Sequence, residues 1–310
     1  MKRIAWSMVV ATVIVGAWVG AWVGAQAQAG NPEATSLSGK PLFPPSPIPN
    51  QAKLEQDLKE AQSVANTTTA DAMIWIGRRL GYLWRYQDAI AQFSKGVERY
   101  PNDPRFYRHR GHRHITVRQF DKAVADFEKA VSLIKGKPDE IEPDGAPNPT
   151  GVPRSTLQFN IWYHLGLAYY LQGNYQKAYD AYVECMNVSK NDDSIVATAD
   201  WTWMTLMRLG RKAEAAKVLE RITPKMDILE NASYHRRLLM YKGIEKPEAL
   251  LDTAKADDTT IATQGYGVGN YYFVTGNNAR ATEVFQKVIS GGGWNAFGYI
   301  AAEADLARMK

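Results

Sequence analysis

The sequence contains a single cysteine, Cys185, among 310 residues. Because a disulfide needs two cysteines, no intramolecular disulfide can stabilise the fold, and side-chain packing must do so. Strong charge of one sign is also absent, since 37 basic residues face 32 acidic ones and the formal net charge is +5. Such a mild excess does not predict nucleic acid as a partner. The 45% hydrophobic content is enough for a large core and excludes disorder throughout the chain.

Motifs of common catalytic sites are missing as well: there is no nucleophile elbow, phosphate loop or zincin helix. The tract RHRGHRH places His109 and His112 three residues apart, but no nearby residues complete a zinc ligand set. Cys185 stands at a small-residue position of a helix, where a buried, inert thiol is expected. We therefore predict no enzymatic activity, no cofactor and no metal. A sealed cavity joining His109, His112 and an acidic residue would reopen that question.

Residues 1–29 have the layout of a secretory signal peptide. A basic start precedes an apolar run from Ile4, which ends in Ala-x-Ala sites between Ala25 and Ala29. An uncleaved membrane anchor is the alternative, because about 20 apolar residues can span a bilayer. Glycines within the run and the lack of a basic flank favour cleavage. We therefore expect an exported protein, periplasmic or secreted if the source is bacterial. The proline-rich residues 30–50 then predict an extended, poorly ordered tether.

The stretch NIWYHLGLAYYLQGNYQKAYDAYVEC, residues 160–185, combines large and small residues at fixed helical offsets. Bulky residues three and four apart make one apolar face, and a small residue lets two helices cross closely. The positions that carry the pattern are Trp162, Leu165, Gly166, Tyr169, Ala178 and Tyr182. This arrangement resembles the tetratricopeptide repeat, in which W-x2-L-G-x2-Y on a first helix precedes A-x3-F on a second.

The pattern recurs along the chain. Aligned on the small residue of the second helix, the units give Ala89, Ala123, Ala178, Ala215, Ala249 and Ala281, with steps of 34, 55, 37, 34 and 32 residues. The long step indicates an insertion, residues 135–158. The fifth unit is the least regular, because Arg236 and Arg237 replace Leu-Gly and Pro247 predicts a short second helix.

The resemblance implies an all-α fold over residues 51–310, a right-handed α-solenoid of about six stacked helix-turn-helix hairpins. Residues 294–310 are expected to form a C-terminal capping helix, and residues 51–64 are expected to cap the other end.

The resemblance also implies a site, because the first helix of each unit lines a concave groove in this family. The family's second, fifth, ninth and twelfth positions carry over to Arg78, Arg105, Arg108, His112, Asn160, Tyr163, Tyr170, Tyr234, Tyr266 and Asn270. The first four make a basic end, and the others make an aromatic, amide-rich remainder. Such a surface suits an extended, acidic peptide segment. The alternative for each tyrosine is packing between adjacent hairpins.

Two interpretations of the insertion stay open. Its Asp139, Glu140, Glu142 and Asp144 could meet the basic end as a lid over the groove, or the segment could be a solvated acidic loop.

Together these features predict a non-enzymatic protein–protein interaction scaffold of the cell envelope. Its partner is an unidentified protein or peptide, and it would contact a membrane only through an uncleaved N-terminal anchor. One alternative is an architectural protein that self-associates through its solenoid edges, which a concentration-dependent mass would reveal. Another is an accessory module of an envelope enzyme complex.

Overall fold

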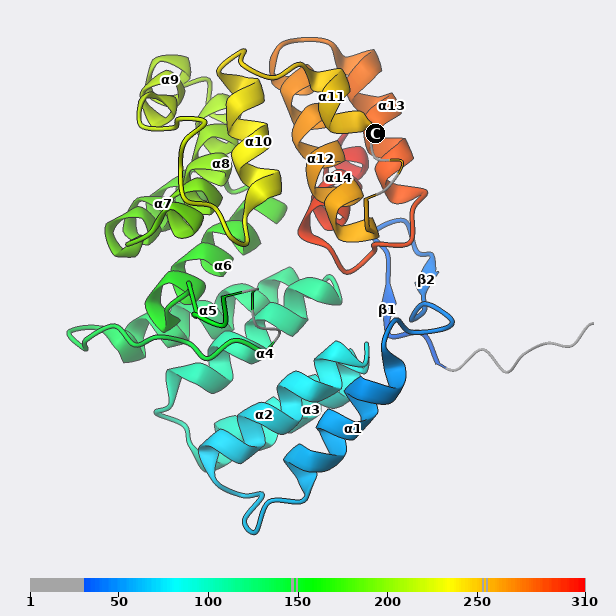
Figure 1. The fold of residues 1–310 in the computed structure, drawn as a ribbon, viewed down its shortest axis with the longest axis vertical. Helices are drawn as coiled ribbons and strands as arrows, with labels where there is room; N and C mark the ends of the chain where they lie inside the picture. The colour runs from blue at the N-terminus through cyan, green and yellow to red at the C-terminus, as the bar shows by residue number, and fades with distance from the viewer. Residues whose placement is uncertain (1–30, 146–147, 149, 253, 255, 310) are drawn as a thin grey trace, which may run out of the picture. The chain divides into compact units, whose positions relative to one another are not determined.

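The computed structural model describes residues 31–145, 148, 150–252, 254 and 256–309, and within them helices follow one another in antiparallel pairs (Figure 1). Two short strands, β1 (Ala34–Thr35) and β2 (Pro41–Leu42), precede them. The helices are α1 (Gln51–Gln62), α2 (Ala70–Tyr82), α3 (Tyr86–Arg99), α4 (Pro104–Thr116), α5 (Phe120–Ile134), α6 (Leu157–Leu171), α7 (Tyr175–Val188), α8 (Asp192–Arg208), α9 (Lys212–Glu220), α10 (Ala232–Tyr241), α11 (Pro247–Leu251), α12 (Asp258–Val274), α13 (Asn278–Ile289) and α14 (Phe297–Arg308).

Helices α2 to α13 pair into six hairpins, which we number 1 to 6 in chain order, and each hairpin packs on its neighbours. Helix α1 packs on α2 at one end, and α14 packs on α12 and α13 at the other. The structure thus confirms the all-α class, the six stacked hairpins and the C-terminal helix that covers the last of them.

Glycine sets the close crossing of the two helices within a hairpin. A β-carbon on Gly166 of α6 would lie 2.6 Å from the ring of Tyr182 on α7, and one on Gly77 of α2 would lie 2.4 Å from the ring of Phe93 on α3. Real β-carbons do not approach rings this closely, so only glycine fits. The repeated Leu-Gly pattern therefore records a packing requirement.

The turn between the two helices uses a left-handed residue, which is glycine in most hairpins. Gly173 and Gly276 have φ of 80° and 93°, but Trp84 and Arg118 occupy the same turn position in hairpins 1 and 2 with φ of 61° and 65°. A left-handed conformation costs a non-glycine residue about 1 kcal/mol or more. The Trp84 ring packs against Trp294, just before α14, and Arg118 pairs with Glu303 within α14. These contacts offset the cost.

Hairpin 5 confirms one expectation and corrects another. Its second helix, α11, is only 5 residues long and begins at Pro247, as the sequence predicts. Ala249, however, is exposed, and Leu250 is the fully buried residue that packs toward α12. A short helix that starts late presents a different residue to the neighbouring helix, so the small-residue alignment fails in this unit.

We expected an extended, poorly ordered tether at residues 30–50, but residues 31–50 form two paired strands that pack on the rest of the protein. Strands β1 and β2 pair antiparallel, with Ala34 opposite Leu42, and both of these side chains are buried. The segment lies beside the C-terminal helix (Figure 1), where the Leu37 amide donates to Glu303 at 3.1 Å. The indole of Trp294 donates to the Phe43 carbonyl at 2.7 Å. The composition of this segment predicted a free linker. The residues that hold it in place are distant in the sequence, so composition gives no sign of them.

The signal peptide or anchor expected at residues 1–29 lies outside the described residues. In the part of the chain that the structure describes, no helix is both long and apolar enough to cross a membrane.

Candidate functional site: a basic pocket between hairpins 1 and 2

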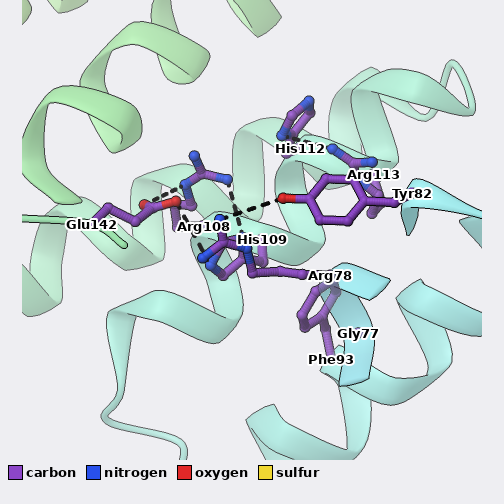
Figure 2. Close-up of a pocket in the computed structure, with 9 residues that line it drawn as sticks. All are labelled: Gly77, Arg78, Tyr82, Phe93, Arg108, His109, His112, Arg113 and Glu142. Atoms are coloured by element: carbon purple, nitrogen blue, oxygen red, sulfur yellow. Dashed lines mark hydrogen bonds and ion pairs between the residues drawn. The ribbon is translucent and has the colours of Figure 1, made fainter. Parts of the chain in front are cut away.

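The first helices of hairpins 1 and 2, α2 and α4, enclose a cavity of about 120 Å³ (Figure 2). Four residues of α4 line it at offsets of one, four and five positions, which places them on one face of the helix. The charged and titratable side chains around this basic pocket are Arg78, Tyr82, Arg108, His109, His112, Arg113 and Glu142. Glu142 comes from the insertion. Four residues of the tract RHRGHRH thus line the pocket, whereas Arg110 and His114 lie beside Asp126.

Positive charge dominates the basic pocket, because three arginines face one carboxylate. Arg108 Nε lies 3.0 Å from a carboxylate oxygen of Glu142, and both side chains are about nine-tenths buried. Asn160 donates to the same carboxylate at 3.2 Å. Burial lowers the pKa of Arg108 and of Arg113, and Glu142 opposes this effect only for Arg108.

The two histidines that line the cavity are neutral. Burial, together with the neighbouring arginines, lowers the pKa of His109 and of His112 well below the usual range. Arg108 Nη1 lies 3.1 Å from His109 Nδ1, and Arg113 Nη2 lies 2.9 Å from His112 Nδ1. Because an arginine nitrogen can only donate, each Nδ1 accepts and each Nε2 carries the proton.

The insertion folds over the basic pocket and forms the lid that the sequence left as one of two possibilities. Besides the contact of Glu142 with Arg108 (Figure 2), Arg78 donates to the Pro143 carbonyl at 2.8 Å and Arg79 donates to the Gly145 carbonyl at 3.2 Å. Asp139 has a different role, because its carboxylate accepts from the Gln158 amide at 2.9 Å near the start of α6. One acidic side chain and two backbone carbonyls thus face the arginines.

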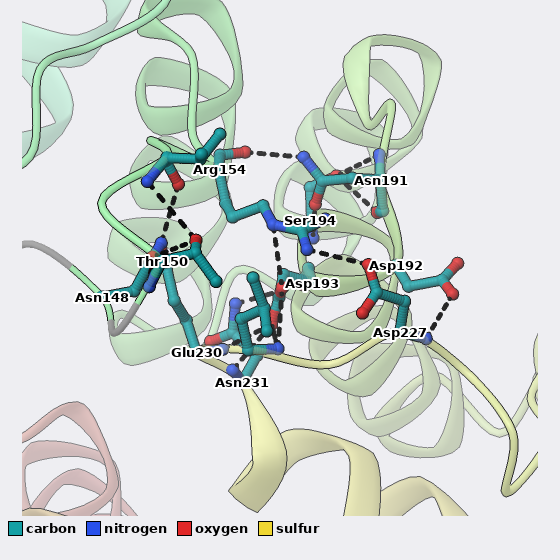
Figure 3. A network of polar contacts seen from close by, with 12 residues as sticks. Asn148, Thr150, Arg154, Asn191, Asp192, Asp193, Ser194, Asp227, Glu230 and Asn231 are labelled. Carbon is teal, nitrogen blue, oxygen red and sulfur yellow. Dashed lines mark hydrogen bonds and ion pairs between the residues drawn. The ribbon is translucent and has the colours of Figure 1, made fainter.

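The far end of the insertion is held by hairpins 4 and 5 (Figure 3). Arg154 pairs with Asp227 at 2.8 Å, and its carbonyl accepts from Asn191 at 2.7 Å. The Asp193 carboxylate, 1% exposed, accepts from the backbone amides of the loop before α10 (Leu229, Glu230 and Asn231). The insertion is therefore fixed both at the basic pocket and at this polar junction.

Residues 159–192, which are hairpin 3, match the family model described as tetratricopeptide repeat. The chain therefore carries a tetratricopeptide repeat. Two solved structures are similar in fold. One is YrrB, described as a tetratricopeptide-repeat protein with an unusual peptide-binding site, at 16% identity and a TM-score of 0.41, covering 83% of this chain and 98% of that one. The other is a tetratricopeptide repeat protein from Parabacteroides merdae, at 15% identity and a TM-score of 0.47, covering 83% and 91%. No curated protein matches the sequence.

The aromatic part of the tetratricopeptide groove differs from the prediction, because its residues are buried against one another. Tyr170, Tyr266 and Asn270 are 0% exposed, and Tyr163 and Asn160 are 5% and 6% exposed. The hydroxyls of Tyr170 and Tyr266 lie 2.8 Å apart, and that of Tyr266 donates to Asp305 of α14 at 3.0 Å. The partly buried Tyr234 accepts from Tyr163 at 2.9 Å. Packing between hairpins, the alternative reading, is what the structure has.

Arg105 belongs to an adjoining opening. This space, of about 290 Å³, lies between α2, the start of α4 and the insertion, and it shares Arg78, His109 and Glu142 with the basic pocket. Arg105 is paired with Asp103 and with Asp71, each at 2.6 Å. Its charge is therefore already balanced, unlike that of Arg113.

Two groups of residues were not anticipated from the sequence. Arg113 lines the basic pocket, although the family's groove positions on α4 do not include it. The Arg-His and His-Arg pairs on either side of Gly111 are the signal that could have identified it. Arg208 and Arg237 also reach inward. Arg208 pairs with Asp305 at 2.6 Å, and Arg237 pairs with Asp200 at 2.8 Å, with both members of the second pair fully buried.

His109, His112 and Glu142 do line one cavity, the arrangement that would reopen the question of catalysis. His109 Nε2 is 3.9 Å from Glu142, whose carboxylate is already engaged by Arg108. Among the described residues, no three His, Cys, Asp or Glu side chains are placed to hold a metal ion together. The cavity is lined mainly by groups that donate hydrogen bonds, which is the chemistry of anion binding.

Proposed function

We propose that the protein is a non-enzymatic interaction scaffold whose basic pocket and adjoining opening bind an acidic segment of a partner protein. In this structure the insertion occupies that place. The observation that carries the proposal is the contact of Glu142, Pro143 and Gly145 with three arginines of hairpins 1 and 2.

The insertion shows what such a ligand would offer. An extended peptide carries backbone carbonyls at regular spacing, and acidic side chains supply carboxylates; the insertion uses one carboxylate and two carbonyls in this way. Arginine can satisfy both, because its guanidinium has five donors in a fixed fork. Stacked helical repeats commonly present such binding surfaces, and a pre-formed surface lowers the ordering cost of binding.

The insertion must leave for a partner to bind. Its tip is poorly buried, with Ile141 68% exposed and Pro143 exposed, so few apolar contacts oppose local opening. Because the insertion is part of the same chain, it competes with a partner for the arginines. For a short flexible linker, the effective concentration of such a tethered segment is in the millimolar range. A free acidic peptide should therefore bind weakly while the insertion is intact and strongly when its carboxylate contact is removed.

The test uses a fluorescent peptide with the sequence of residues 138–145 and measures its binding by anisotropy. We expect Glu142→Lys to bind the peptide at least about tenfold more tightly than the parent, because the lid then repels the arginines. Glu140→Lys is the matched control, since it makes the same charge change at an exposed position of the same loop. Adding Arg108→Gln to Glu142→Lys should remove the gain.

The proposal fails if Glu142→Lys and Glu140→Lys bind the peptide equally, or if Arg108→Gln leaves the binding of a still-helical protein unchanged. A peptide with glutamine in place of its glutamates separates charge recognition from nonspecific adhesion, and it should not bind.

We further infer that the scaffold acts outside the cytoplasm, in the envelope or beyond it. The support is the signal-like sequence of residues 1–29. Cell fractionation, with mass spectrometry of the mature N-terminus, tests this: a new terminus near Ala29 in an exported fraction would support it, and an intact cytoplasmic chain would refute it.

A further inference from the structure

We propose that the basic pocket is also a binding site for a phosphate group, either free phosphate or the phosphate of a small monoester, which enters while the insertion stays in place. This site shares the basic pocket with the partner segment but differs in needing the insertion in place, because it uses the space that remains beside Glu142.

Among the described residues, two arginines that line this space have no carboxylate partner, and a third has a buried donor without an aligned acceptor. Within the described part of the chain, neither Arg78 nor Arg113 forms an ion pair with a carboxylate. Arg113 instead contacts His112 and lies over the Tyr86 ring at 5.5 Å. Arg108, 7% exposed, has an Nε that is near Glu142 but has no aligned hydrogen-bond acceptor. Arg78 and Arg113 are half-buried, and positive charge that is partly desolvated without an anionic partner favours the binding of an anion.

The charge of the pocket matches a dianion. Three arginines and one carboxylate leave a net charge of +2, since both histidines are neutral. A phosphate dianion neutralises this charge, whereas a single carboxylate would leave one positive charge buried. The three guanidinium groups offer several N–H donors, which suit an acceptor with several oxygens.

The size of the cavity favours a small group. A cavity of about 120 Å³ is large enough for several water molecules. This admits a phosphate group but not an extended peptide. Arg78 lies on α2 and Arg113 on α4, so the donors that line the pocket come from two helices (Figure 2).

The dependence of binding on pH separates the ligand's titration from that of the protein. The titratable and charged groups around the histidines are Arg78 and Tyr82 of α2, Tyr86 of α3, Arg108 and Arg113 of α4, Glu142 of the insertion and His164 of α6. If the histidines stay neutral, a phosphate monoester should bind more tightly as pH rises through about 6, where its second proton leaves. Sulfate, which stays a dianion, should bind equally well across this range.

The experiment is isothermal titration of the purified full chain with inorganic phosphate, glycerol 2-phosphate and sulfate at constant ionic strength. We expect saturable binding at one site and an affinity loss of at least about tenfold for Arg113→Gln. Arg113→Lys, which keeps the charge, should retain part of the affinity. Arg221→Gln, an exposed arginine of hairpin 4, is the matched control and should bind like the parent.

If Arg113→Gln does not fold, as judged by its circular dichroism, Arg78→Gln replaces it with the same expected loss. Tighter binding of the monoester than of free phosphate would identify a small phosphorylated molecule as the ligand, and the reverse would identify phosphate itself. The proposal is overturned if the parent shows no saturable binding of either, if Arg113→Gln or Arg78→Gln binds like the parent, or if sulfate and monoester both bind more tightly as pH falls. The peptide assay above tests the proposed function separately, because it depends on displacing the insertion with Glu142→Lys and on Arg108, and not on Arg113.

Discussion

The buried ion pair of Arg118 and Glu303 joins hairpin 2 to the C-terminal helix, and breaking it tests how these parts are held. The Arg118 Nε lies 2.8 Å from the Glu303 carboxylate, and the two side chains are only 3% and 6% exposed. Arg118 also donates to the Trp294 carbonyl at 2.8 Å, and Glu303 accepts from the Leu37 amide. One carboxylate therefore connects the N-terminal strands, hairpin 2 and α14.

The expected loss follows from two opposing effects. Removing one partner of a buried pair costs about 3–5 kcal/mol, because the other charge stays buried. Arg118 has φ of 65°, and glycine at this position would relieve about 1 kcal/mol of left-handed strain. We therefore expect Arg118→Gly to lower the free energy of unfolding by about 2–4 kcal/mol. Glu303→Gln brings no such relief, so it should cost about 1 kcal/mol more than Arg118→Gly.

Urea unfolding, followed by far-ultraviolet circular dichroism, measures these differences. The double variant should lose less than the sum of the two single variants, because no isolated charge remains. A glycine variant as stable as the parent would refute the reasoning, since the relief of about 1 kcal/mol of strain would then offset the whole contribution of the ion pair.

Four further predictions follow from single positions. Gly166→Ala should lower the free energy of unfolding by about 1–3 kcal/mol, because its β-carbon would overlap the Tyr182 ring; equal stability in a urea titration would contradict this crossing. Asp193→Ala should cost at least about 2 kcal/mol in the same assay, because several backbone amides lose their acceptor. Burial raises the pKa of Cys185 to about 12, so a thiol reagent at pH 8 should label the protein only after unfolding, and rapid labelling of the native state would contradict it. Burial raises the pKa of Tyr86 to about 12, above the value of about 10 in the unfolded chain. The contribution of Tyr86 to stability is therefore intact below pH 10 and is lost as pH rises to 12. Circular dichroism at fixed urea should show a smaller alkaline loss for Tyr86→Phe.

Much of the fold could be predicted from the sequence, because a hairpin is specified by residues that are close along the chain. Gly77, Gly111 and Gly166 each sit opposite an aromatic residue one helix later, and this spacing repeats. The basic pocket could be predicted for the same reason, since Arg108 and His112 share one face of a single helix. The contact of Glu142 with the basic pocket was one of two alternatives, the other being a solvated acidic loop. The sequence does not choose between them, because the position of a long loop depends on contacts at both of its ends.

The order of the helices, their pairing and the basic face of α4 can be predicted from the sequence, because these features depend on local periodicity. The accessibility of the predicted groove residues depends instead on contacts between distant parts of the chain. Tyr170 and Tyr266 are 96 residues apart and meet in the interior, and Asp305 joins them from a further 39 residues away. Such distant polar contacts leave no periodic signal, so a tyrosine of the core and a tyrosine of a binding groove read alike in the sequence. The strands at residues 34–42 were missed for the same physical reason, since their partner helix lies at the opposite end of the chain.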